Sequence, residues 1–396
     1  MNDTVYIFGA GINKVLKIES PNARSANLSP EFYMEVNPPL VNDFFQVALK
    51  LEEYGYLHGD YDMLYDYIVQ TWKKSKLELR TSKLNLEDCF TDVEMQLNQA
   101  IGNKDIKRIK ELGKVKHMFI SLFINIFNLF ENQFSVRSSG DLSFFGEYIF
   151  KNKPAIITFN YDYFIELSIE KASDYYLDNH EIAITPNWKK SQAYGMKFDE
   201  IETFGIRNGE SIIKGDEFYS TNDLYTWSIL KLHGSLNWFQ YRPLSDHPDF
   251  ADEPRYPLPE ELSEKIILRF DSSDLTIMGN FDIKGRYVSP IIITPKIHKS
   301  TAYERYAYVL DSLWKKAEQI LSRCRNLIII GYSFPESDTR TKELFEKAFS
   351  NNNLEGLTIV NPDRSVDEKV VKLCNFSKSV ARFEDLNGYL RSLGME

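Results

Sequence analysis

A histidine stands at the end of a short apolar run in the segment "ILKLHGSLNWF", residues 229–239. The run 229–232 predicts a β-strand and Gly234-Ser235 the turn that ends it, so His233 lies where a strand gives way to a loop. In open α/β sheets, ligands bind at that edge. Because an imidazole titrates at about pH 6.5, His233 is a candidate general base. A histidine that only hydrogen-bonds inside a turn is the alternative interpretation.

Two further polar pairs follow apolar runs. In "AIITFNYDYF", Thr158 ends a predicted strand, and Asn160 and Asp162 come directly after it. An asparagine side chain offers a donor and an acceptor, which matches a carboxamide such as that of nicotinamide. In "LTIVNPD", Asn361 and Asp363 follow another strand, where they would hold ribose hydroxyls. Simple turns at strand ends are the alternative for both pairs.

A glycine-rich turn follows the first predicted strand. "FGAGINK" places Gly9, Ala10 and Gly11 where a backbone could approach a pyrophosphate, whose charge nearby helix N-terminal amides favour. The third glycine of the dinucleotide fingerprint is missing, because Lys14 stands in its place. A tight structural turn would have the same sequence, so both interpretations stay open.

A second turn of this kind lies late in the chain. "IIIGYSFPESD" supplies Gly331 and Ser333 after a predicted strand, in a position suited to phosphate or ribose contact. The alternative is an ordinary strand-to-helix turn. In either case Asp338 is a candidate N-cap for the helix predicted to follow it.

The elements that would position these residues are six short apolar runs, each ended by a turn or a polar cluster: "TVYIF", "AIIT", "ILKL", "IIIT", "LIII" and "LTIV". Runs this apolar are typical of strands covered on both faces, as in a parallel sheet. Residues 303–321 and 339–350 predict helices, the first with its apolar residues on one face. The alternation of predicted strands and helices from Ile291 to Val360 therefore predicts an α/β, Rossmann-like three-layer domain with a mostly parallel sheet.

Two segments interrupt the alternation. Residues 42–139 are helix-like, with no convincing strand, and predict an all-helical insertion into a domain formed by residues 1–41 and 140–396. An excursion at about 241–287 is rich in Pro, Asp and Glu and has a strand or two of its own. The apolar run at 118–130 is too short and too rich in asparagine to span a bilayer. It forms either an assembly surface or the insertion's own core.

Composition excludes several functional classes. The formal net charge of the 396-residue chain is −10 with no block of consecutive Lys or Arg, so direct nucleic-acid binding is not expected. Cys89, Cys324 and Cys374 form no CxxC pair, and the other histidines show no metal-like spacing, so neither a metal site nor a disulfide framework is expected. The N-terminus has no basic region or cleavage site, and a cytoplasmic protein is predicted.

Five motifs, in their order along the chain, resemble those of the sirtuin-like NAD-binding domain. They are GAG near the N-terminus, T-x-N-x-D, K-L-H-G-S, G-Y-S and a closing I-V-N. The resemblance spans nearly the whole chain and is to the bacterial Sir2-like group associated with anti-phage defence. It implies NAD+ binding at the carboxyl edge of the sheet. It also implies that Asn160 and Asp162 line the nicotinamide and ribose pocket and that His233 is the catalytic residue.

The chain departs from the protein deacylases of that family. It lacks the two cysteine pairs of their zinc module, and Phe159 stands where they usually have Gln. The resemblance therefore implies an NAD+ glycohydrolase that releases nicotinamide and ADP-ribose and depletes NAD+ on infection. The alternatives are an NAD-dependent deacylase or ADP-ribosyltransferase, and a non-catalytic sensor of NAD+ or ADP-ribose.

The chemistry assigns each residue a role. Breaking the nicotinamide–ribose bond builds positive charge at the anomeric carbon, and nicotinamide leaves as a neutral molecule. His233 would accept a proton from a ribose hydroxyl or water, Asn160 would orient the carboxamide or the water, and Asp162 would stabilise the cation. Because the chain ends soon after its last predicted strand, we expect control by homo-oligomerisation or by another polypeptide. Comparable short Sir2-like chains pair with a HerA-type ATPase.

Overall fold

The computed structural model describes residues 3–19, 35–57, 59–136, 140–178, 188–205, 209–214, 227–246, 257–269, 281–282, 286–293, 306–351 and 354–395. At its centre is a six-stranded sheet with the order β14-β13-β12-β1-β4-β7, in which every pairing is parallel. The strands are β1 (Thr4–Phe8), β4 (Ala155–Thr158), β7 (Ile229–Lys231), β12 (Asn326–Ile330), β13 (Gly356–Val360) and β14 (Ala381–Phe383). Taken in chain order, this is the doubly wound arrangement, with its topological switch point between β1 and β12.

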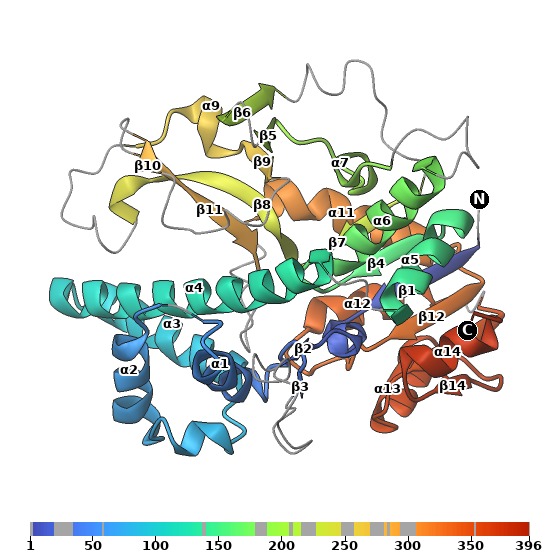
Figure 1. Cartoon of the computed structure of the whole chain (residues 1–396), viewed down its shortest axis with the longest axis horizontal. Helices are drawn as coiled ribbons and strands as arrows, with labels where there is room; N and C mark the ends of the chain where they lie inside the picture. The colour runs from blue at the N-terminus through green and yellow to red at the C-terminus, as the bar shows by residue number, and fades with distance from the viewer. Residues whose placement is uncertain are drawn as a thin grey trace, which may run out of the picture.

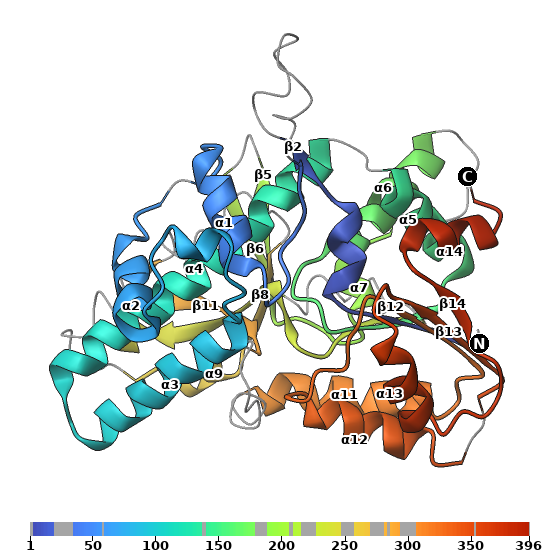
Figure 2. The same cartoon turned by 90° about the horizontal axis from the view of Figure 1, so that it is seen from below.

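Helices cover both faces of this sheet (Figure 2). They are α5 (Gly140–Asn152), α6 (Phe164–Asp178) and α14 (Leu386–Ser392) on one face, and α11 (Ala307–Leu321), α12 (Thr339–Ala348) and α13 (Ser365–Leu373) on the other. Alternate residues of β1 face the two layers, because side chains along a strand point in opposite directions. Tyr6 and Phe8 join the apolar cluster under α5 and α14, whereas Val5 and Ile7 join the cluster under α11 and α12. The expected α/β architecture with helices on both faces of a parallel sheet is confirmed.

A second six-stranded sheet, with the order β10-β11-β8-β9-β5-β6, was not predicted as a unit. Its strands are β5 (Glu200–Gly205), β6 (Gly209–Lys214), β8 (Gly234–Pro243), β9 (Ile266–Arg269), β10 (Phe281–Asp282) and β11 (Arg286–Ile292). The assignment of "IIIT" to the parallel sheet is wrong, because Ile291 and Ile292 belong to β11, which pairs antiparallel with β8. A strand buried on both faces has the same apolar sequence pattern in either sheet, so the pattern does not indicate which sheet it joins.

The turn after β7 also differs from the prediction. It falls on Leu232 and His233, and Gly234 and Ser235 are already the first residues of β8. Gly234 has φ +82°, and a Cβ there would lie 2.0 Å from the backbone oxygen of Ile291. Only glycine fits where the chain passes from the first sheet into the second.

Helices fill much of the chain between β1 and β4 (Figure 1). They are α1 (Phe44–Glu53), α2 (Asp62–Trp72), α3 (Leu86–Gly102) and α4 (Ile106–Val136), with the short elements η1 (Ala10–Val15), β2 (Ile18–Glu19), β3 (Glu35–Val36) and η4 (Glu78–Arg80). The remaining short helices are α7 (Lys190–Ala193), α9 (Glu260–Ser263) and η5 (Leu244–Asp246). In Figure 1 the second sheet lies above α4, and α1–α3 lie below it.

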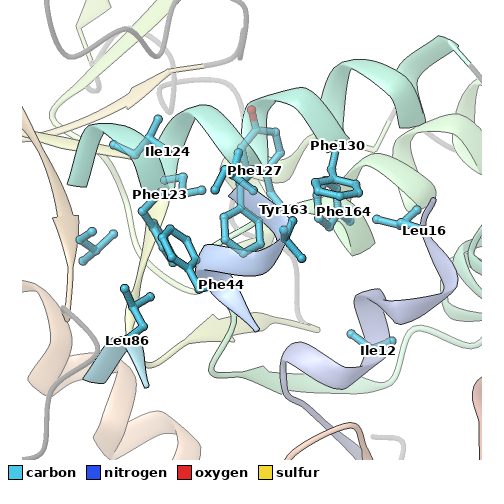
Figure 3. Close-up of a cluster of buried hydrophobic side chains, with 14 of the residues drawn as sticks. Ile12, Leu16, Phe44, Leu86, Phe123, Ile124, Phe127, Phe130, Tyr163 and Phe164 are labelled. Carbon is cyan, nitrogen blue, oxygen red and sulfur yellow. The ribbon is translucent and has the colours of Figure 1, made fainter. Parts of the chain in front are cut away.

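The long helix α4 packs against the parallel-sheet unit through aromatic side chains (Figure 3). Phe123 stacks on Phe44 of α1 at 6.0 Å between ring centroids, and Phe127 lies 6.5 Å from Phe164 of α6. These residues belong to one apolar cluster with Tyr6 and Phe8 of β1. The core of the helical segment is therefore continuous with that of the sheet, and the apolar run 118–130 is largely buried inside the chain. None of the helices that the structure describes is long and apolar enough to cross a bilayer.

Candidate functional site

The residues singled out in the sequence lie at the carboxyl ends of adjacent strands. Residues 9–15 follow β1, residues 159–163 follow β4, His233 follows β7, and residues 331–338 follow β12. Since β12, β1, β4 and β7 are neighbours in that order, these segments share one edge of the sheet. This is the edge where doubly wound proteins bind their ligands.

The glycines after β1 and β12 pack backbone against backbone. The N–H of Gly11 donates to the oxygen of Gly331 at 2.9 Å, and the N–H of Gly9 donates to that of Ile330 at 3.0 Å. A Cβ on Gly9 would lie 2.5 Å from the Cα of Tyr332, and one on Gly11 would lie 2.7 Å from the Cα of Gly331. This close approach explains why positions 9 and 11 are glycine without invoking a ligand. Ala10, between them, is exposed at the edge.

Asn160 and Asp162 line a small cavity beyond β4. Both are buried, with 8% and 7% of their surface exposed. Asn160 Nδ2 donates to the oxygen of Gly9 at 3.3 Å, and the Asn160 N–H donates to Thr158 Oγ1 at 3.1 Å. Polar groups of Asn13, Thr158, Asn160 and Asp162 meet apolar side chains around the cavity. Its volume of about 10 Å³ leaves room for about one water molecule.

Asn13 belongs to this group, although the sequence analysis passed over it. Its Nδ2 donates to Asp162 Oδ2 at 2.6 Å, and the Phe164 N–H donates to Asp162 Oδ1 at 3.3 Å. The signal was present in "FGAGINK", where an asparagine follows the glycine-rich turn.

The carboxyl group of Asp162 is hard to ionise. Burial raises its pKa from 3.8 to about 6, and the neighbouring Glu166 carboxylate adds to the rise. The Lys231 ammonium and the hydrogen bonds from Asn13 and Phe164 oppose it. A carboxyl group with this pKa is still mostly ionised at neutral pH, and it changes its charge just below that pH.

His233 lies in a pocket of aromatic rings with an acid beside it. Its Nε2 is 3.1 Å from Asp338 Oδ2, and only 4% and 1% of the two side chains are exposed. The Tyr332 hydroxyl donates to the same Asp338 oxygen at 2.6 Å. The Phe159 ring meets the imidazole edge-on at 5.1 Å, and the Tyr161 ring lies 6.1 Å away.

Asp338 does not act as the predicted cap. It occupies the N-cap position of α12, but its side chain makes no capping hydrogen bond there. Tyr332 and His233 hold the carboxylate instead. These contacts replace the capping hydrogen bond, and the sequence pattern at the start of a helix does not indicate them.

Asn160 and His233 have different neighbours at the sheet edge. Asn160 shares its cavity with Phe8 of the cluster under α5 and α14. The imidazole of His233 lies near the ring of Phe159, which belongs to the cluster under α11 and α12, and near that of Tyr161, which packs against the opposite cluster. A substrate that touches both groups must therefore extend along the carboxyl edge from the cavity to these rings.

The residues after β13 form a turn next to this edge. Asn361 Nδ2 donates to the oxygen of Tyr332 at 3.3 Å, and Asn361 Oδ1 accepts from the Asp363 N–H at 2.9 Å. Asp363 Oδ1 accepts from the Ser365 N–H at 2.9 Å, and that bond holds the pKa of the exposed Asp363 below its usual value. Ser333 is exposed. The hydrogen bonds of Asn361 and Asp363 are those expected for a turn, the alternative to a ribose-binding role.

No protein-family model and no curated protein matches the chain. Within the residues that the structure describes, no group of three or more His, Cys, Asp or Glu side chains could hold a metal ion. His58, His180, His247 and His298 lie outside the described residues. The site's own chemistry is therefore the basis for assigning a function.

Proposed function

We propose that this protein is an NAD+ glycohydrolase, which cleaves the bond between nicotinamide and ribose and releases nicotinamide and ADP-ribose. The observation that carries the proposal is the carboxyl edge of the doubly wound sheet. There a buried Asn160–Asp162 pair follows β4, and a buried His233–Asp338 pair joins the segments after β7 and β12. In cleavage of an N-glycosidic bond, an amide can orient the carboxamide or the water, an ionised acid can stabilise the cation, and an imidazole can accept a proton.

The cavity beside Asn160 and Asp162 suits the attacking water. Its size matches one water molecule, and an amide and a carboxylate on its wall can orient that molecule. The ionised Asp162 also places negative charge where the anomeric carbon becomes positive. Water contributes its oxygen to the new C–O bond, nicotinamide leaves with the electrons of the broken C–N bond, and one proton is released.

His233 is assigned to the ribose. The Asp338 carboxylate, 3.1 Å from Nε2, can stabilise the positive charge that the ring gains when it accepts a proton. Because Asn160 lines the water-sized cavity and His233 does not, we assign the water to Asn160 and a ribose hydroxyl to His233. Accepting a proton from that hydroxyl strengthens its electron donation to the cation.

The cellular role is proposed from the resemblance alone. We propose NAD+ depletion in the cytoplasm during anti-phage defence, controlled by homo-oligomerisation or by a HerA-type ATPase. Co-purification with such an ATPase and light scattering of the purified protein test this control. A persistent monomer that is fully active without a partner would contradict it.

Incubation of the purified protein with NAD+, followed by chromatography of the products, tests the activity. We expect nicotinamide and ADP-ribose from the wild type, and at least about 100-fold slower release from Asn160→Ala and His233→Ala. Asn152→Ala, which removes an exposed side chain of α5 that donates to the Tyr148 oxygen, is the matched control. It should cleave NAD+ at the wild-type rate.

The same experiment separates the alternatives. Turnover that needs an acylated peptide or another acceptor would identify a deacylase or an ADP-ribosyltransferase. Binding of NAD+ without nicotinamide release would identify a sensor. Unaltered turnover by His233→Ala would remove His233 from the mechanism.

A further inference from the structure

The turn that carries His233 is bonded to the loop that carries Asn160 and Asp162. Two residues before the histidine, Lys231 Nζ donates to the backbone oxygen of Asp162. Two residues after it, Ser235 Oγ donates to the backbone oxygen of Tyr161 at 3.2 Å. The backbone bond from the Leu236 N–H to that same oxygen, at 2.9 Å, fixes the start of β8 against the loop.

Lys231 makes its bond from a fully buried position. Its ammonium lies 3.0 Å from Glu166 Oε1 of α6, and neither side chain has any exposed surface. A buried ion pair of this kind is often no more stabilising than a pair of apolar side chains of similar volume. An apolar pair would not hold the Asp162 carbonyl, and this directed bond is what distinguishes the lysine.

Ser235 is held in turn by other buried polar groups. Its single hydroxyl proton is shared between the Tyr161 oxygen and Asn237 Oδ1, which lies 2.6 Å from Oγ, and Asn237 Nδ2 donates to the Tyr194 hydroxyl at 3.2 Å. Burial and the nearby Glu166 carboxylate raise the pKa of that hydroxyl well above its usual value. The polar groups around Ser235 thus extend toward the partner of Lys231.

We propose that Lys231 and Ser235 are positioning residues that fix the His233 turn relative to the Asn160–Asp162 loop. His233 and Asn160 lie in segments that follow different strands, so they act on one substrate only if these two segments keep a fixed spacing. The two bonds that flank His233 set that spacing. This inference rests on the proposed NAD+ cleavage, and it assigns functions to the Lys and Ser of "KLHGS".

Amide hydrogen exchange tests the connection without reference to activity. Ser235→Ala should speed exchange of the amides of 160–163 by about 10-fold, because the loop opens more readily without the bond. Lys231→Met paired with Glu166→Leu should do the same, and it removes both members of the buried ion pair together. Ser168→Ala, which removes a buried hydroxyl that donates to the Ile165 oxygen of α6, is the matched control. Unchanged exchange in both test variants would overturn the proposal.

Kinetics test the consequence for catalysis. Ser235→Ala should lower kcat about 10-fold with KM within about 2-fold, because a small displacement of a catalytic group slows the chemical step. In a His233→Ala background the same substitution should have no further effect on kcat, since there is no longer an imidazole to position. An equal loss in both backgrounds would show a general structural role and overturn the proposal.

The exchange and kinetic experiments distinguish a failure of the proposed function from a failure of the positioning role. A wild-type protein that leaves NAD+ intact refutes the proposed function, and the exchange experiment still decides whether Lys231 and Ser235 hold the loop. An active wild type with unchanged exchange in the variants refutes the positioning role alone.

Discussion

The carboxylate of Asp338 lies 3.1 Å from Nε2 of His233, although the strands that precede the two residues are not neighbours. β7 and β12 are separated in the sheet by β4 and β1. The segment after β12 therefore reaches across the carboxyl ends of two strands. The Tyr332 ring, stacked on Phe159 at 4.2 Å, spans part of that distance.

Asp338→Asn should slow NAD+ cleavage. The amide keeps an oxygen for the Tyr332 hydroxyl but loses the negative charge that would stabilise a protonated His233. We expect kcat to fall roughly 10- to 100-fold, part of the ~10²- to 10⁴-fold that a general base contributes. Steady-state kinetics with chromatographic detection of nicotinamide measure this loss.

The control for Asp338→Asn is Asp311→Asn, which weakens a half-exposed ion pair with Arg340 of α12. It tests whether disturbing that helix alone slows the reaction, and it should leave kcat unchanged. Wild-type kcat in Asp338→Asn would show that the Asp338 contact has no part in the chemistry.

Gly9→Ala should destabilise the protein whether or not nucleotide is present. The added Cβ would meet the Cα of Tyr332 at 2.5 Å, so the two strand ends must move apart. We expect a loss of about 1–3 kcal/mol in the free energy of unfolding, measured by urea denaturation without NAD+.

Gly102→Ala is the matched control for Gly9→Ala, because a Cβ at this helical position meets nothing within 4 Å. It should leave stability unchanged or raise it by up to about 1 kcal/mol. If Gly9→Ala were as stable as the wild type and impaired only NAD+ binding, the pyrophosphate interpretation of this glycine would replace the packing one.

The sequence predicted the parallel sheet because its strands are buried on both faces. β1, β4, β12 and β13 each coincide with one of the apolar runs. The second sheet was missed because strands such as β8, "GSLNWFQYRP", mix polar and apolar residues without a clear alternation. Which sheet a strand joins is decided by its partners, as β11 shows by pairing with β8.

Within the site, the sequence predicted which residues end the strands but not how they pair. The alternation of Phe159 and Asn160 follows from strand geometry alone. The positions of the His233 and Asp338 side chains do not follow from strand geometry, because each residue lies in a turn whose direction depends on tertiary contacts. Asn13 was missed because its bond to Asp162 joins residues from two different strand ends.

All three cysteines should resist alkylation in the native protein. Cys89, Cys324 and Cys374 are free and buried, and burial raises the pKa of each thiol, that of Cys324 to about 12. Only the thiolate reacts readily, so iodoacetamide at pH 8 should add nothing to the folded chain. Mass spectrometry should show three adducts after alkylation in denaturant. Rapid modification of the native protein at any of the three would contradict their burial.

The stability of the protein should depend on pH through Asp162. Its pKa is about 6 in the folded chain against 3.8 as the ordinary value, so the folded state binds more protons between about pH 4 and pH 6. The free energy of unfolding therefore falls as pH rises through that window, and this group contributes up to about 3 kcal/mol of the fall. Above the folded pKa the contribution is constant.

Asp162→Asn removes this dependence, because an amide does not titrate. Urea denaturation of both proteins from pH 4 to pH 7 should show the variant gaining about 3 kcal/mol relative to the wild type across the range. The loss of one acceptor for the Asn13 or Phe164 N–H is independent of pH and cancels in that comparison. A difference that stays constant with rising pH would show that Asp162 ionises as readily in the folded chain as in water, and one that shrinks would show that it ionises more readily. The variant should also lose NAD+ cleavage at every pH, since the charge that destabilises the fold is the one that stabilises the cation.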